Sequence, residues 1–164
     1  MFGIVIFLYI LLRFRKWQFS LGAVAAVFHD VIIVLSIFSI FYGILPFSLE
    51  IDQAFIAALL TIIGYSLNDT VVVFDRIREH MFLFKKKEFN SLVNNALNST
   101  LSRTVNTSLT TFFVLLVIFL FGGEVIRGFM FALMVGVIVG TYSSLFVASP
   151  IMVDTLKKSL DIKK

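Results

Sequence analysis

The chain has 164 residues, of which 59% are hydrophobic and 15% are charged, and its mean hydropathy is +1.00. These values exclude an ordinary soluble domain and indicate a polytopic membrane protein. Because the chain contains no cysteine, disulfides and thiolate metal sites are excluded as well. The formal net charge of +4 would suit a nucleic-acid-binding protein, but the positions of the charges favour another explanation.

Five apolar segments follow one another along the chain, separated by short charged loops, whereas a bilayer core takes about 20 apolar residues to cross. They predict an all-α membrane bundle with helices over about 2–16, 20–45, 54–80, 105–121 and 128–153. The first segment is too short to span, and it lacks the basic start and the cleavage site of a signal peptide. We therefore expect residues 1–164 to form a single transmembrane domain whose first helix is incomplete.

Thirteen of the fourteen Lys and Arg residues lie on one side of the predicted membrane. They occur between the first two helices, between the third and fourth helices and in the tail, and Arg127 alone lies on the other side. The positive-inside rule then places these loops and the C-terminus in the cytoplasm. Since the basic runs have no aromatic interleaving, they predict topology and not nucleic-acid binding.

The loop before the fourth helix contains a further helical pattern over residues 89–101. Its apolar residues recur at helical spacing, at Leu92, Val93, Ala96, Leu97 and Leu101. This spacing predicts an amphipathic helix that lies on the cytoplasmic membrane surface.

Carboxylates inside the apolar segments are the strongest functional signal. Asp69 lies in "GYSLNDTVVVFDRIREH" (64–80), and Asp30 lies near the middle of the second helix beside His29. An ionised carboxylate at mid-bilayer costs about 3 kcal/mol, so each aspartate is expected to be paired, neutral or in a water-filled cavity. Proton relays are built from such groups, although a structural Asp69 bound by Tyr65 or by a backbone group is an open alternative.

Small and polar residues define the faces of these helices. On the third helix Leu60, Ile63, Leu67, Val71 and Phe74 form an apolar stripe that is expected to face lipid, opposite Thr61, Gly64, Tyr65, Asn68 and Asp69. Gly22, Ala26 and Asp30 share a face of the second helix, and Arg103, Thr107, Thr110 and Thr111 share one of the fourth. On the fifth helix a row of small residues recurs every four positions and predicts close packing: Gly128, Ala132, Gly136, Gly140, Ser144 and Ala148.

The motif at 64–80 and four further stretches resemble the SecF subunit of the bacterial SecD–SecF protein-export complex. These stretches are "HDVIIVLSIFS", "LSRTVNTSLTT", "FLFGGEVIRGF" and "GTYSSLFVASP", and together they cover nearly the whole chain in order. The resemblance implies a resistance-nodulation-division-like fold. Members of this family normally carry one more helix and an extracytoplasmic domain before these five helices, and both are expected to be absent here.

The function that the resemblance implies is proton-coupled translocation, performed by a transport subunit and not by a classical enzyme. The proton-motive force would promote late steps of preprotein translocation, with Asp69 of the Asn-Asp-Thr motif and Arg103 of the Ser-Arg-Thr motif as a charge pair. Asp30 is a weaker candidate, and Gly64, Tyr65, Asn68, Thr70 and Thr107 support the motif. By residue type alone, Arg103 could equally be an interfacial topology charge.

The resemblance also implies partners and a location. SecD, the SecYEG translocon, YajC, YidC, exported preproteins and the lipid bilayer are the expected partners, in the inner membrane with a cytoplasmic C-terminus. No cofactor or metal is expected, and sodium in place of the proton is an open alternative.

Other classes of function are also open. Asp30 and Asp69 could form the dyad of an intramembrane aspartyl protease, but their contexts, His-Asp and Asn-Asp, differ from that family's Tyr-Asp and Gly-x-Gly-Asp motifs. A non-catalytic translocase scaffold and half of another resistance-nodulation-division transporter are the remaining alternatives.

Overall fold

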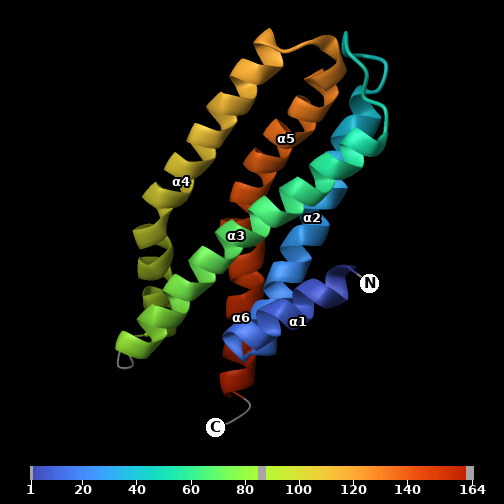
Figure 1. The fold of residues 1–164 in the computed structure, drawn as a ribbon. Helices are drawn as coiled ribbons and strands as arrows, with labels where there is room; N and C mark the ends of the chain where they lie inside the picture. Colours follow the sequence, from blue (N-terminus) through green and yellow to red (C-terminus); the bar gives the residue numbers. More distant parts are fainter. Residues whose placement is uncertain (1, 85–87, 162–164) are drawn as a thin grey trace.

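The computed structural model describes residues 2–84 and 88–161, and these are helical apart from short connections (Figure 1). The elements are α1 (Phe2–Phe14), α2 (Trp17–Phe41), α3 (Gln53–Leu83), α4 (Phe89–Phe121), α5 (Glu124–Ser143), the π-helical turn η1 (Ser144–Ala148) and α6 (Ser149–Asp161). Within these described ranges, four helical stretches are long and apolar enough to cross a membrane: α2, α3, α4 and the rod that runs from α5 through η1 into α6. The predicted all-α, multi-pass bundle is confirmed, with α1 as a shorter apolar helix.

Local sequence signals explain where the helices begin and turn. Asp52 caps α3, because its side chain accepts a hydrogen bond of 2.8 Å from the backbone N–H of Phe55. The connection between α2 and α3 includes Gly43, whose φ of 75° lies in the left-handed region that glycine adopts without strain. Gly122 and Gly123 connect α4 to α5.

Successive long helices run in opposite directions, so the charged loops gather at two ends of the bundle (Figure 1). We call the end that carries Arg13, Arg76, Arg78 and Lys157 the basic end. Arg13 and Asp75 form an ion pair of 2.8 Å there, joining α1 to α3. The basic residues Lys85, Lys86, Lys87, Lys163 and Lys164, which contribute to the topology prediction, lie outside the described residues.

Helix α4 differs from its prediction. The expected surface helix at 89–101 and the expected membrane helix at 105–121 are one continuous helix of 33 residues. The sequence contains no Gly or Pro between Phe89 and Phe121 that would break it. The apolar residues Leu92, Val93 and Ala96 are buried in the bundle core, so they do not face a membrane surface.

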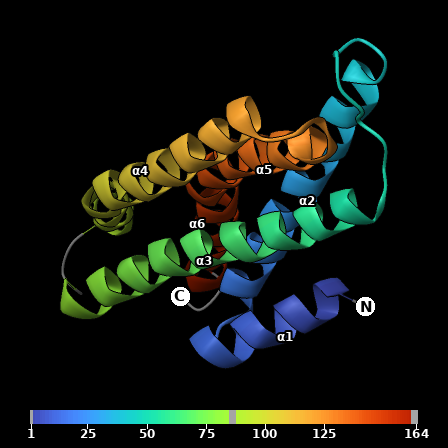
Figure 2. The ribbon, with the colours of Figure 1, turned by 45° about the horizontal axis from the view of Figure 1, so that its top comes forward.

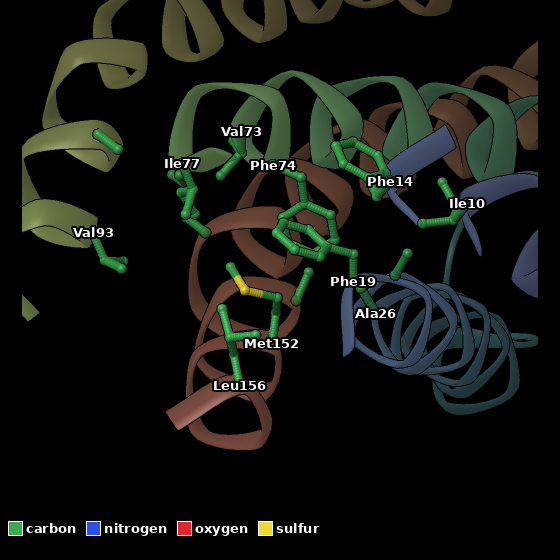
Figure 3. Close-up of a cluster of buried hydrophobic side chains, with 14 of the residues drawn as sticks. Ile10, Phe14, Phe19, Ala26, Val73, Phe74, Ile77, Val93, Met152 and Leu156 are labelled. Carbon is green, nitrogen blue, oxygen red and sulfur yellow. The ribbon is translucent and has the colours of Figure 1, made fainter. Parts of the chain in front are cut away.

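Two apolar clusters form the core, one at each half of the bundle. The cluster toward the basic end contains the rings of Phe14, Phe19 and Phe74, with ring centroids 5.0 Å apart for Phe14 and Phe19 and 5.2 Å apart for Phe19 and Phe74. Figure 3 shows these rings beside Met152 of α6. The other cluster includes Phe38 of α2 and residues of α3 and α5. Along α2 and the α5–η1 rod, polar and small residues separate the two clusters, whereas on α3 they meet at Ile62 and Ile63.

The faces of α3 also differ from the prediction. Phe74 and Ile63, expected to face lipid, are buried, whereas Thr61, Gly64 and Asn68 of the polar face are exposed. The reason is that α3 packs against α2, α4 and α5, as Figure 2 shows, so this chain covers part of its apolar stripe while Leu60 stays exposed. The hydrophobic pattern identifies a two-faced helix but does not say which face the bundle covers.

Candidate functional site

The Asp69 carboxylate is held between three elements near the middle of the bundle. It accepts a hydrogen bond of 3.2 Å from Thr104 Oγ1 of α4 and one of 3.3 Å from Ser144 Oγ of η1. Tyr65 donates to Ser108 at 3.4 Å instead, so the alternative in which Tyr65 satisfies Asp69 is wrong. Asp69 itself is only partly buried.

Ser144 stands where the last membrane helix changes its winding. The following turn is π-helical, and the Ser149 hydroxyl donates a hydrogen bond of 2.8 Å to the Ser144 carbonyl oxygen. The Ser144 hydroxyl also lies 2.9 Å from the carbonyl oxygen of Thr141. Single π-helical turns inside α-helices occur frequently at functional sites.

The row of small residues on α5 and η1 forms a close interface with α3 and α2, as predicted. A side chain at Gly136 would overlap Ile62, and a Cβ at Gly140 would lie 3.0 Å from Ser66 Cβ. One turn further on, Ser144 meets Asp69. We call this line of contacts between α3 and the α5–η1 rod the α3–α5 seam. The Asp69 carboxylate lies where the seam comes nearest to the basic end.

Asp30 lies on α2 and is fully buried, on the same face as Gly22 and Ala26, as predicted. Its Oδ2 accepts a hydrogen bond of 2.5 Å from Ser66 Oγ of α3, and its Oδ1 lies 3.1 Å from His29 Nδ1. No hydrogen bond links Asp30 and Asp69, each of which has separate partners among the described residues. The two aspartates thus lack the shared-proton contact of an aspartyl protease dyad.

Arg103 lies next to Thr104 on α4, but its side chain is exposed. The hydrogen bonds and ion pairs of the described chain do not include its guanidinium, so the expected direct pair with Asp69 is not formed in this chain. Adjacent helical residues point about 100° apart, and Thr104 takes the inward direction. The charge of Arg103 still acts on Asp69 at longer range.

A cavity of about 350 Å³ opens between α3 and α4 on the basic side of Asp69. Arg103 lines it together with Val72, Asp75, Arg76, Glu79, Ser99 and Thr100. Two arginines bind residues that line this cavity. Arg13 forms an ion pair with Asp75, and Arg76 forms an ion pair with Glu79 and a hydrogen bond with Ser99. The cavity offers water a polar approach to the turn of α4 that precedes Thr104.

The other predicted residues divide by position. Thr70 is buried and Tyr65 half-buried, whereas Gly64, Asn68 and Thr107 are exposed. The sequence reasoning missed the groups that hold the carboxylates, namely Ser66 and Thr104, and it assigned Ser144 only to packing. A usable signal was the spacing of Thr100, Thr104 and Ser108, which recur every four residues on one helix face.

Comparisons with known proteins identify the family of the chain. Residues 1–158 match the family described as "Protein export membrane protein SecD/SecF, C-terminal". The chain belongs to this family. It is 65% identical over 151 residues to the protein translocase subunit SecF of Rhodothermus marinus, covering 92% of this chain and 49% of that protein. It is 51% identical over 157 residues to SecF of Thermodesulfovibrio yellowstonii, covering 94% of this chain and 50% of that protein.

Solved SecDF structures have the same fold. A crystal structure of SecDF in a super-membrane-facing form superposes with a TM-score of 0.84 at 44% identity, over 98% of this chain and 21% of that one. A crystal structure of SecDF from Thermus, described as a translocon-associated membrane protein, gives 0.80 at 46% identity, over 92% and 20%. The chain spans about half the length of the SecF proteins it matches.

Proposed function

We propose that this chain forms the membrane part of a SecF-type export subunit, which uses proton movement through the membrane to promote preprotein translocation together with SecD. The observation that carries the proposal is the Asp69 carboxylate, which lies inside a membrane bundle and is bound, among the described residues, by the hydroxyl groups of Thr104 and Ser144. Intramembrane carboxylates of this kind are typical of proton relays. The names of the relatives support the assignment to export.

Proton binding at Asp69 would change the contacts between helices. The ionised carboxylate attracts the hydroxyl donors of α4 and η1 and, at longer range, the Arg103 guanidinium. Protonation removes that charge, so the balance between two packings of α3, α4 and η1 shifts. Water in the cavity beside Arg103 would carry the proton between Asp69 and the basic end, which we assign to the cytoplasm.

The exposed polar surface supports the assignment of a membrane partner. Gly64 and Asn68 of α3, and Arg103 and Thr107 of α4, are exposed in this chain although they belong to membrane-crossing helices. Polar side chains are costly against lipid, so we propose that SecD covers them and contributes a carboxylate to Arg103. We place the complex in the inner membrane with a cytoplasmic C-terminus, in association with SecYEG and, in the wider assembly, YajC and YidC.

The test uses the full-length subunit with SecD, reconstituted with the translocon in vesicles. Export is measured with and without an imposed proton gradient, since ATP-driven insertion would otherwise mask the step. Asp69→Asn keeps the size but fixes a neutral side chain, so we expect assembly with SecD to persist and stimulation by the gradient to disappear. An Asp69→Asn complex that responds fully to the gradient would contradict the relay and favour a scaffold.

Arg103 gives a second comparison in the same assay. Lysine keeps the charge but loses the planar fork, whereas methionine keeps only the length. We expect partial stimulation after Arg103→Lys and none after Arg103→Met. Equal activity of the two variants would exclude a role for the charge.

A further inference from the structure

His29 and Asp30 form a second buried acid site that is separate from the hydrogen bonds of Asp69. Asp30 has a relative exposure of 0% and is the one buried carboxylate of the described residues. Its two oxygens are taken by Ser66 and His29, while the His29 side chain is 31% exposed and reaches the outer side of the bundle. There its ring lies 6.3 Å from the ring of Tyr142 of α5.

His29 and Asp30 form no hydrogen bond or ion pair with a Lys or Arg in the described parts of the chain. The ring of Tyr142 on α5 lies near the His29 ring, and Asp69, three residues after Ser66 on α3, binds Thr104 and Ser144 instead of the pair. α1, η1 and α6 contribute no hydrogen bond or ion pair to it among their described residues.

We propose that the His29–Asp30 pair acts as a positioning group for Asp69 and is not a member of the relay. Asp30 fixes Ser66, and Ser66 packs against Gly140 at the α3–α5 seam. One turn further along the same seam, Ser144 binds Asp69. The pair therefore sets the register of α3 against α2 and α5 one turn away from the hydrogen bond between Ser144 and Asp69. This inference rests on the proposed proton-driven function of Asp69.

Two substitutions of Asp30 separate positioning from relay in the full-length complex with SecD. Asp30→Asn is neutral and keeps an acceptor for Ser66, so gradient-driven export is expected to stay within about twofold of the unmodified complex, with the same pH profile. Asp30→Leu has a similar size but leaves the buried Ser66 hydroxyl unpaired. It is expected to lower gradient-driven export about tenfold and to shift its pH profile, because Asp69 and Ser144 no longer meet in register.

Ser66→Ala removes the same contact from the other side and is expected to lower export in the same direction as Asp30→Leu. If Asp30→Leu does not assemble, Ser66→Ala is compared with Asp30→Asn in its place. Loss of the gradient response in Asp30→Asn would overturn the proposal by making Asp30 a relay member. Full activity of Asp30→Leu or Ser66→Ala would overturn the positioning role. An Asp69→Asn complex that still responds would instead refute the proposed function, whatever the Asp30 variants do.

Discussion

Hydroxyl groups, and not a cation, hold the Asp69 carboxylate, and they come from two different elements. A hydroxyl can donate to an ionised carboxylate and can accept from a protonated one, so it serves both protonation states. A buried arginine would stabilise only the ionised state. In this chain Arg103 precedes the donor Thr104, so its charge acts on Asp69 from a distance. It therefore makes no direct contact that would hold Asp69 in the ionised state.

This role of the hydroxyls predicts the effect of Thr104→Val. Valine keeps the shape but removes the donor, and net contributions of such hydrogen bonds are about 1 kcal/mol. We expect gradient-driven export to fall severalfold while the complex still assembles. Thr110→Val on the same helix is the control, because the Thr110 hydroxyl binds the carbonyl oxygen of Asn106 and no other group of the described residues. Equal effects of the two variants would show that the Thr104 hydroxyl does not act on Asp69.

The site could be predicted only in part from the sequence. Asp69 and Asp30 stand out because a carboxylate in an apolar helix is costly. Ser66 and Ser144 do not stand out, since hydroxyl residues are common in membrane helices and commonly bind their own backbone. Thr104 is indicated only by its four-residue spacing from Thr100 and Ser108. The distance between Arg103 and Asp69 depends on how α3 and α4 pack, which the order of residues along each helix does not determine.

At the scale of elements, the α5–η1–α6 rod combines a tight interface with a π-helical turn. Its small residues allow α3 to approach, and the turn begins at the residue that binds Asp69. A change at Asp69 would therefore act on a helix at a point where its winding is already irregular. This is where a repacking driven by protonation would begin.

The tight interface predicts a difference between two glycines. Alanine at Gly136 would overlap Ile62, whereas a Cβ at Gly64 meets no atom within 4 Å. Overpacking costs about 1–3 kcal/mol, so Gly136→Ala is expected to lower the thermal stability of the detergent-solubilised complex, and Gly64→Ala to leave it nearly unchanged. The reverse order would mean that the row of small residues is not an interface.

The helices themselves were predictable because their length and hydropathy are set by the bilayer. The continuity of α4 was not, since residues 89–104 are polar enough to suggest a loop or a surface helix. Burial of Leu92, Val93 and Ala96 against the rest of the bundle stabilises them as the first turns of a long helix. Similarly, the covered face of α3 depends on its neighbours and not on its own periodicity.

At the scale of the whole molecule, charge and exposed polarity describe how the bundle is placed. Most described basic residues lie at or toward one end, whereas Arg127 and the acidic residues Glu50, Asp52 and Glu124 lie at the opposite end. Figure 1 shows the helix ends that form these two ends of the bundle. Between the ends, the exposed polar residues of α3 and α4 form a face that is unfavourable in contact with lipid. The bundle is therefore expected to be oriented by its basic end and completed by a membrane partner.

The orientation can be tested directly because the chain has no cysteine. Glu50→Cys and Glu88→Cys are a matched pair, both exposed and placed at opposite ends of the bundle. In intact cells an impermeant thiol reagent is expected to label the cysteine at position 50 and to spare the one at position 88. Lysed cells, in which both should react, provide the control. Labelling at position 88 in intact cells would show that the basic end faces outward and would contradict the predicted topology.

The central claim is that Asp69 gains and loses a proton while Asp30 does not. Infrared difference spectra of the full-length complex with SecD, recorded between acidic and alkaline buffers, report the carbonyl band of a protonated carboxyl group directly. We predict a titrating band that disappears in Asp69→Asn and persists in Asp30→Asn. A band that remains unchanged in Asp69→Asn would contradict the account.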